Sequence, residues 1–83
     1  MPLPEFQHSH TKRYDFEVRE GDRVHHRVER VALPNMAEAW AIVGDLSRRF
    51  DRPGARIMVR DENGGVLIYV GAISAQTMAE SAT

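Results

Sequence analysis

The chain has 83 residues, of which 42% are apolar and none is cysteine. This length fits one small domain, and the lack of cysteine excludes disulfides, thiolate metal sites and a thiol nucleophile. Eleven basic residues face twelve acidic ones, so the net charge of −1 gives no global attraction to nucleic acid or to anionic membranes. Because no run of about 18 apolar residues is present and the first residues lack a secretory pattern, we expect a cytoplasmic protein.

Both ends of the chain are predicted to be flexible tails, residues 1–11 and 73–83. The first stretch holds two prolines and two histidines with little apolar content, and the last is small and polar. Between them the composition shows no linker and no repeat, so residues 12–72 are predicted to form a single domain.

The first extended region, residues 12–30, predicts a β-hairpin. Tyr14, Phe16 and Val18 alternate with charged residues, and a similar alternation follows the glycine of the turn. A three-residue turn at positions 20–22 keeps both apolar sets on one face, and therefore predicts Val18 opposite Val24. The same register predicts charged pairs on the outer face: Glu17 with His25, Asp15 with Arg27, and Arg13 with Glu29.

A helix is predicted from residue 36 to residue 50. Asn35, with Glu38 three residues later, is a capping-box-like start, and Pro53-Gly54 ends the helical pattern. Apolar residues recur at spacings of three and four: Met36, Ala39, Trp40, Val43, Leu46 and Phe50.

A second β-hairpin is predicted from residues 56–60 and 66–70. Asn63-Gly64 between them is a strong signal for a two-residue turn, because both turn positions need positive φ. This turn predicts Val59 opposite Ile68, Ile57 opposite Val70, Met58 opposite Tyr69 and Arg60 opposite Leu67. Since the last strand is apolar on both faces, it is predicted to lie centrally in the sheet.

Together these elements predict an α+β fold of order ββαββ, a two-layer sandwich with one helix packed on a four-stranded, mainly antiparallel sheet. The pattern leaves the strand order open. The residues predicted to face the helix are Tyr14, Phe16, Val18, Val24, Val28, Ile57, Val59, Val66, Ile68 and Val70.

Three motifs carry a resemblance to a known family. They are Tyr14-x-Phe16-x-Val18-Arg19-x-Gly21-Asp22, Leu33-Pro34-x-x-x-Glu38-Ala39 and Asp61-Glu62-x-Gly64. Over residues 13–72 the chain resembles a set of short proteobacterial proteins that carry a domain of unknown function. The resemblance implies a fold and a lineage, and it implies no catalytic or binding residues.

The outer face of the predicted sheet holds the candidate functional residues. Met58, Leu67 and Tyr69 are apolar residues among charges, so we expect a non-enzymatic protein-interaction module that forms a homodimer or binds another protein. The alternative is a nucleic-acid-binding or regulatory protein that uses an arginine-rich face. Its candidate anion contacts are Arg23, Arg27, Arg56 and Arg60.

Other chemistry has little support in the sequence. His8, His10, His25 and His26 are the histidines that a metal site would use, but successive strand residues such as His25 and His26 point to opposite faces. The serines lie in no recognisable motif. We therefore expect no catalytic residue, no cofactor, no metal and no membrane contact.

Overall fold

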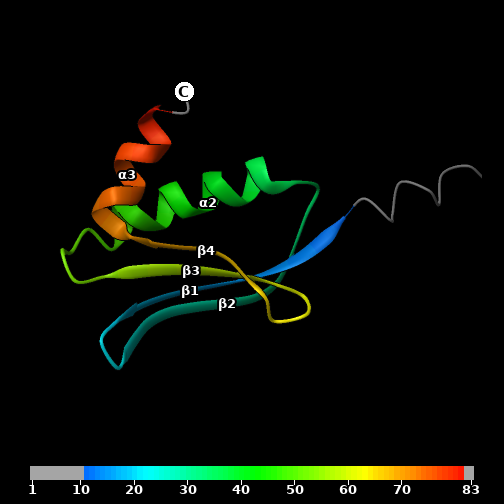
Figure 1. Ribbon diagram of the computed structural model, residues 1–83, viewed down its shortest axis with the longest axis horizontal. Helices are drawn as coiled ribbons and strands as arrows, with labels where there is room; N and C mark the ends of the chain where they lie inside the picture. Colours follow the sequence, from blue (N-terminus) through cyan, green and yellow to red (C-terminus); the bar gives the residue numbers. More distant parts are fainter. Residues whose placement is uncertain (1–10, 82–83) are drawn as a thin grey trace, which may run out of the picture.

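The computed structural model describes residues 11–81, and within this range the chain forms four strands and two helices (Figure 1). Their bounds are β1 Lys12–Glu20, β2 Arg23–Leu33, α2 Met36–Arg49, β3 Arg56–Asp61, β4 Val66–Gly71 and α3 Ala72–Ser81. All neighbouring strands pair antiparallel, in the order β2-β1-β3-β4. The α+β class is therefore confirmed.

Both helices lie on the same side of the sheet, so one sheet face is covered and the other is open (Figure 1). The core fills the space between the covered face and α2. Its fully buried large side chains are Phe16, Val18, Val43, Ile57 and Val59. Because Phe16 and Val18 come from β1 and Ile57 and Val59 from β3, the two central strands supply most of the sheet side of the core.

Helix α2 matches its prediction closely. The side chain of Asn35 accepts a hydrogen bond from the backbone N–H of Glu38 at 3.1 Å, so one free donor of the first turn is satisfied. The predicted apolar stripe is the buried stripe, with Ala39, Val43 and Leu46 buried and Trp40 packed beside them.

Helix α3 differs from the prediction of one helix followed by a flexible tail. It begins directly after β4, and its small buried residues Ala72 and Ala75 pack against the rest of the core. Gln76 Nε2 donates to the backbone oxygen of Ser47 at 3.1 Å and to Asp51 Oδ1 at 2.9 Å. Alanines give a weak apolar signal, so the packing that stabilises this helix is not visible as a stripe in the sequence. Residues 1–10, most of the other predicted tail, lie outside the described residues.

The three-residue turn predicted for the first hairpin is wrong. Glu20 pairs with Arg23, so Gly21 and Asp22 alone form the turn, and Gly21 takes a positive φ of 62°. A bulge then corrects the mismatch of faces, because Arg19 faces Val24 while Val18 faces His26.

Val24 consequently lies on the open face beside Arg19 and is 39% exposed, not buried as predicted. The predicted outer pairs are also wrong: Glu17 faces Arg27, and Arg13 faces Ala32.

A second bulge on β2 lies opposite Asp15. Tyr14 faces Val31 while Phe16 faces Val28, and Arg30 between them has a φ of 59°. The backbone N–H of Arg30 donates to Asp15 Oδ1 at 2.9 Å. Val28, predicted to be buried, is 39% exposed because β2 is an outermost strand and is covered less completely than the central strands.

The second hairpin keeps three of its four predicted pairs. Ile57 faces Val70, Met58 faces Tyr69 and Val59 faces Ile68. Arg60, however, faces Val66 rather than Leu67, because a bulge at the start of β4 shifts the register there. Val66 is therefore exposed, contrary to its predicted burial.

The loop before β4 is organised by one carboxylate. Asp61 Oδ1 accepts from the backbone N–H groups of Asn63 at 2.9 Å and Gly65 at 2.8 Å. Gly64 has a φ of 88°, the positive value that the Asn-Gly signal anticipates. The predicted two-residue turn at Asn63-Gly64 is wrong: the backbone N–H of Asp61 donates to the oxygen of Gly65 at 2.8 Å, so residues 62–64 form a three-residue turn, and Gly64 but not Asn63 has a positive φ.

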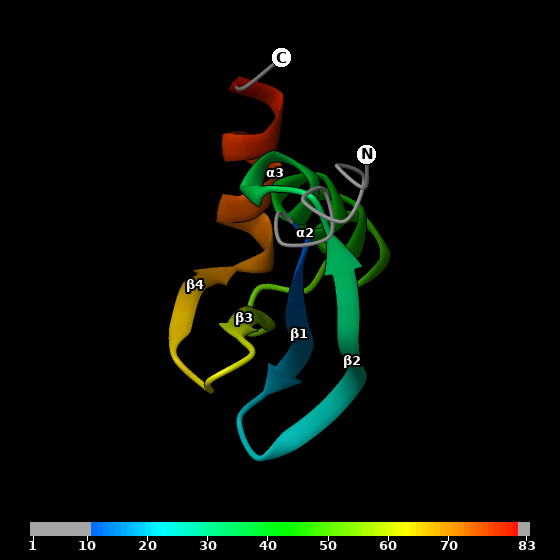
Figure 2. The same ribbon diagram turned by 90° about the vertical axis from the view of Figure 1, so that its right-hand side faces the viewer.

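The central position predicted for β4 is wrong, because β4 is an edge strand (Figure 2). Its apolar composition has two causes in the structure. Ile68 is buried beneath the helices, whereas Tyr69, on the opposite face, is exposed. Exposed apolar residues on an edge strand and buried apolar residues in a central strand therefore give the same sequence pattern.

Candidate functional site

The free edge of β4 has little protection against pairing with another strand. The strand consists of Val66, Leu67, Ile68, Tyr69, Val70 and Gly71, with no proline and no charged side chain. Val66, Leu67 and Tyr69 are exposed, as is Ile73 at the start of α3. Natural edge strands usually carry charges, prolines or irregularities that prevent pairing with another chain. Beyond the bulge at its start, β4 carries none of these.

The register of β4 shows which backbone groups face outward. Ala72 N donates to the backbone oxygen of Ala55 at 2.9 Å, which makes this a hydrogen-bonded position of the β3–β4 pair. Hydrogen-bonded and non-hydrogen-bonded positions alternate along an antiparallel pair. Tyr69, which faces Met58, therefore occupies a non-hydrogen-bonded position with respect to β3. Its own N–H and C=O point away from β3, toward the free edge.

The opposite edge, on β2, is protected. Its 11 residues include Arg23, Arg27, Glu29 and Arg30, and the strand is interrupted by two bulges. Charges and bulges are the usual means by which an edge avoids pairing. The two edges of the sheet therefore differ in kind, and β4 is the less protected of the two.

The predicted interface residues Met58 and Tyr69 lie together on the open face. They pair across β3 and β4, and Tyr69 is 58% exposed while Met58 is partly covered. Leu67 lies apart from this pair. It lines a hollow at the loop end of the sheet with Lys12, Met36 and other residues, because the bulge displaces it from the regular register.

The open face also holds a buried carboxylate, Glu17, for which the sequence predicts only an outer-face pair with His25. Glu17 is only 6% exposed, although it lies on the face that the helices leave open. Arg19 Nε lies 2.9 Å from Glu17 Oε2, Arg27 Nη2 lies 3.7 Å from the same oxygen, and Arg60 Nη1 lies 3.7 Å from Oε1. Three guanidinium groups from three strands thus surround one carboxylate.

The predicted anion contacts do not form one cluster. Arg27 and Arg60 meet at Glu17, which offsets part of their charge. Arg23 lies at the turn of the first hairpin, opposite Glu20. Arg56 faces Arg19 on β1 and Gly71 on β4, and in the described part of the chain it forms no ion pair.

A shallow hollow of about 180 Å³ opens beside Glu17. Its polar lining mixes the carboxylates of Asp15, Glu17 and Glu29 with the guanidiniums of Arg27 and Arg60. This alternation of charge gives the hollow no preference for an anion or a cation, so we assign it no small ligand.

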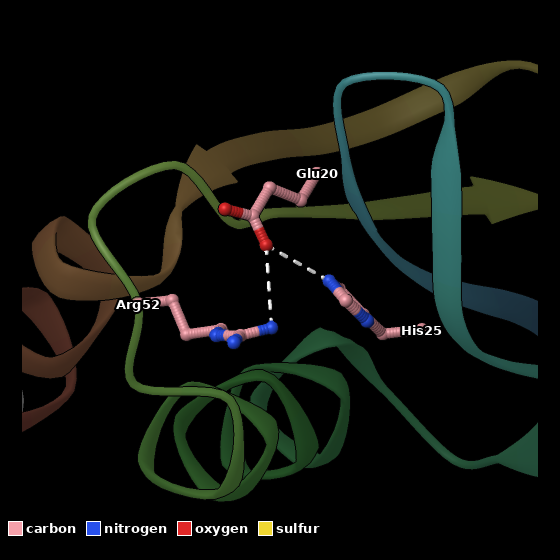
Figure 3. A network of polar contacts seen from close by, with 3 residues as sticks. All are labelled: Glu20, His25 and Arg52. Carbon is pink, nitrogen blue, oxygen red and sulfur yellow. Dashed lines mark hydrogen bonds and ion pairs between the residues drawn. The ribbon is translucent and has the colours of Figure 1, made fainter.

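A network of polar contacts joins the first hairpin to the loop that follows α2 (Figure 3). His25 Nε2 lies 3.0 Å from Glu20 Oε1, and Arg52 Nη1 lies 3.4 Å from the same oxygen. The hydrogen bond with His25 lowers the pKa of Glu20 below its ordinary value, and the positive charges of Arg52 and Arg23 act in the same direction. Glu20 thus links the first hairpin to Arg52 in the loop after α2.

Both strand histidines contact one aromatic ring, contrary to the prediction that they point to opposite faces. The ring centroids of His25 and His26 lie 6.1 Å and 5.6 Å from that of Phe50. The bulge at His25 explains this, because it interrupts the alternation of faces. The guanidinium of Arg49 lies over the same ring at 5.5 Å. Phe50 therefore packs against the hairpin residues next to the polar network of Glu20, His25 and Arg52.

In the part of the chain that the structure describes, no group of three or more histidine, cysteine, aspartate or glutamate residues is arranged to hold a metal ion. His8 and His10, two of the four histidines considered for such a site, lie outside that part. Among residues 11–81, no helix has the length and apolar character to cross a membrane.

Comparison with known proteins gives no relative to set beside this site. No family model, no curated protein and no solved structure matches the chain.

Proposed function

We propose that the chain is a homodimeric interaction module whose two copies join through the free edge of β4. The observation that carries the proposal is a conflict between composition and position. β4 has the apolar composition of a central strand, yet it lies at the edge of the sheet without the charges that protect β2. Pairing with β4 of a second copy makes the strand central and removes the conflict.

The geometry of the edge favours a two-fold pairing centred on Tyr69. An antiparallel strand pair is compatible with two-fold symmetry, in which both copies use the same surface. The outward N–H and C=O of Tyr69 then bond those of Tyr69 in the second copy, and Leu67 faces Gly71. The two phenol rings lie across from each other on the open face, in the cross-strand arrangement that favours aromatic pairs.

Two substitutions at one position test this pairing. Tyr69→Ala removes the ring but keeps the outward N–H, whereas Tyr69→Pro removes the ring and the N–H together. Proline is tolerated where a strand's N–H faces away from its neighbour, so the β3–β4 pair should survive in both variants. Two symmetric hydrogen bonds are worth about 2 kcal/mol together, which corresponds to a dimer about 30-fold weaker for the proline variant than for the alanine variant.

Light scattering behind size exclusion, over a range of concentrations, gives the readout. The wild-type chain should have the mass of two chains, and Tyr69→Pro should shift to one chain at concentrations where Tyr69→Ala still associates. Circular dichroism should show the same helix content in all three proteins. A wild-type mass of one chain at every concentration, or equal dimerisation of the two variants, contradicts the proposal.

A further inference from the structure

On the open face of the sheet, β1 and β2 present charges of both signs, whereas β3 and β4 present no carboxylate. β3 presents Arg56 and Arg60 on this face, on either side of Met58, because residues two apart in a strand point the same way. The carboxylates of this face belong to the other two strands: Asp15 and Glu17 lie on β1, and Glu29, which lines the same hollow, lies on β2. β4 adds Tyr69 and no charged side chain. The part of the face next to the free edge is therefore basic and has no carboxylate of its own.

The dimer brings the two basic parts together, and the inference below rests on the proposed function. Pairing through β4 gives the strand sequence β3, β4, β4, β3 at the centre of one continuous sheet. The two β3 strands then lie about 14 Å apart, which is three strand spacings. Two copies each of Arg56, Arg60 and Tyr69 surround the symmetry axis, and we call this set the arginine–tyrosine strip. The carboxylates of β1 and β2 lie on the side of β3 away from the free edge, so they flank the strip and do not interrupt it.

We infer that the arginine–tyrosine strip binds single-stranded nucleic acid. Guanidinium groups bind phosphate oxygens in a two-point geometry, and an exposed aromatic ring on a sheet provides a surface on which a base stacks. Arg56 forms no ion pair within the described residues. The ion pair of Arg60 with Glu17 Oε1 is long, at 3.7 Å, so a phosphate oxygen can replace the carboxylate. Since the whole chain has a net charge of −1, binding depends on this local arrangement.

Fluorescence anisotropy with labelled oligouridylate and oligothymidylate of about 12 nucleotides tests the inference at low salt, where phosphate contacts are strongest. The strip variant is Arg56→Gln with Arg60→Gln. The matched control is Arg23→Gln with Arg48→Gln, which removes the same charge from the hairpin turn and from an exposed position on α2. The strip variant should bind at least about tenfold more weakly than wild type, and the control within about twofold.

The salt dependence gives a second readout. Four phosphate contacts predict that the logarithm of the association constant falls with the logarithm of salt concentration with a slope of about −3. Tighter binding of the uridylate than of the thymidylate would show a contact to the 2′-hydroxyl, and comparable binding would show a strip that reads phosphate and base stacking alone. Either result supports the inference.

The solution mass, measured in the same buffer, distinguishes failure of the nucleic-acid inference from failure of the proposed dimer. A chain with the mass of two copies that binds neither oligonucleotide overturns this inference and leaves the proposed function in place. Equal losses in the strip variant and the control would show general charge attraction and would also overturn it. A mass of one chain contradicts the proposed function itself.

Discussion

His25 Nε2 lies 3.0 Å from Glu20 Oε1, so the turn of the first hairpin carries an interaction that depends on pH. The hydrogen bond from His25 lowers the pKa of Glu20 below 4.5, and the nearby charge of Arg52 adds to this effect. The folded protein therefore binds a proton at Glu20 more weakly than the unfolded chain does. The contribution to stability is complete above the unfolded-chain pKa and is lost as the pH falls through the lower folded pKa.

Glu20→Gln tests this dependence. The wild type should be more stable than the variant at neutral pH, by a small amount because the carboxylate side chain is 41% exposed. The difference should disappear as the pH falls below the ordinary range of a glutamate. Urea denaturation followed by Trp40 fluorescence at several pH values measures it. A difference that stays constant from neutral to acidic pH would show that the Glu20 charge is not involved.

The bulge on β2 predicts an unusual order of stability at Arg30. Its φ of 59° is a left-handed conformation that costs a residue with a Cβ about 1–2 kcal/mol, whereas glycine adopts it freely. Arg30→Gly should therefore be more stable than Arg30→Ala by about 1 kcal/mol, the reverse of the usual order in a strand. Thermal or urea denaturation of the two variants gives the comparison. If the alanine variant is the more stable, the backbone at this position is not left-handed.

The packing of α3 against the core predicts a strong contrast between two neighbouring positions. Ala75 is fully buried and Ser74 is exposed, so glutamate at the first position must bury a charge and at the second it remains in water. Ala75→Glu should destabilise the fold by about 3 kcal/mol or more, and Ser74→Glu by less than about 0.5 kcal/mol. Urea denaturation measures both values. Similar small losses in the two variants would mean that the segment after β4 does not pack on the core.

The elements that the sequence predicts correctly are those with local signals. The Asn35 cap and the apolar stripe from Met36 to Phe50 are enough to define α2, and they do not depend on the rest of the fold. Three pairs of the second hairpin were also predicted correctly, because Asn63-Gly64 marks the position of its turn. Met58 and Tyr69 were also predicted correctly as neighbours on one face, because the bulge at Leu67 offsets the extra turn residue and restores the predicted register beyond it.

The features that the sequence misses depend on contacts between distant residues. The register of the first hairpin requires a bulge at His25 and another at Arg30, and the second is held by a backbone bond to Asp15, fifteen residues away. The burial of Glu17 depends on arginines from three strands and so on the strand order, which the hydrophobic pattern does not determine. The edge position of β4 likewise depends on the strand order.

A single cysteine at position 69 tests the pairing of two β4 edges most directly, because the chain contains no other cysteine. In the proposed pairing of β4 with β4 of a second copy, residue 69 occupies a hydrogen-bonded position. The two Cα atoms at such a position lie about 5.5 Å apart, within the range that a disulfide spans. Under mild oxidation Tyr69→Cys should form a covalent dimer with the folded circular dichroism spectrum. The control is Asp22→Cys, at the exposed turn of the first hairpin. On a non-reducing gel this variant should run largely as a single chain. Equal cross-linking of the two variants, or none at position 69, would contradict the proposed dimer.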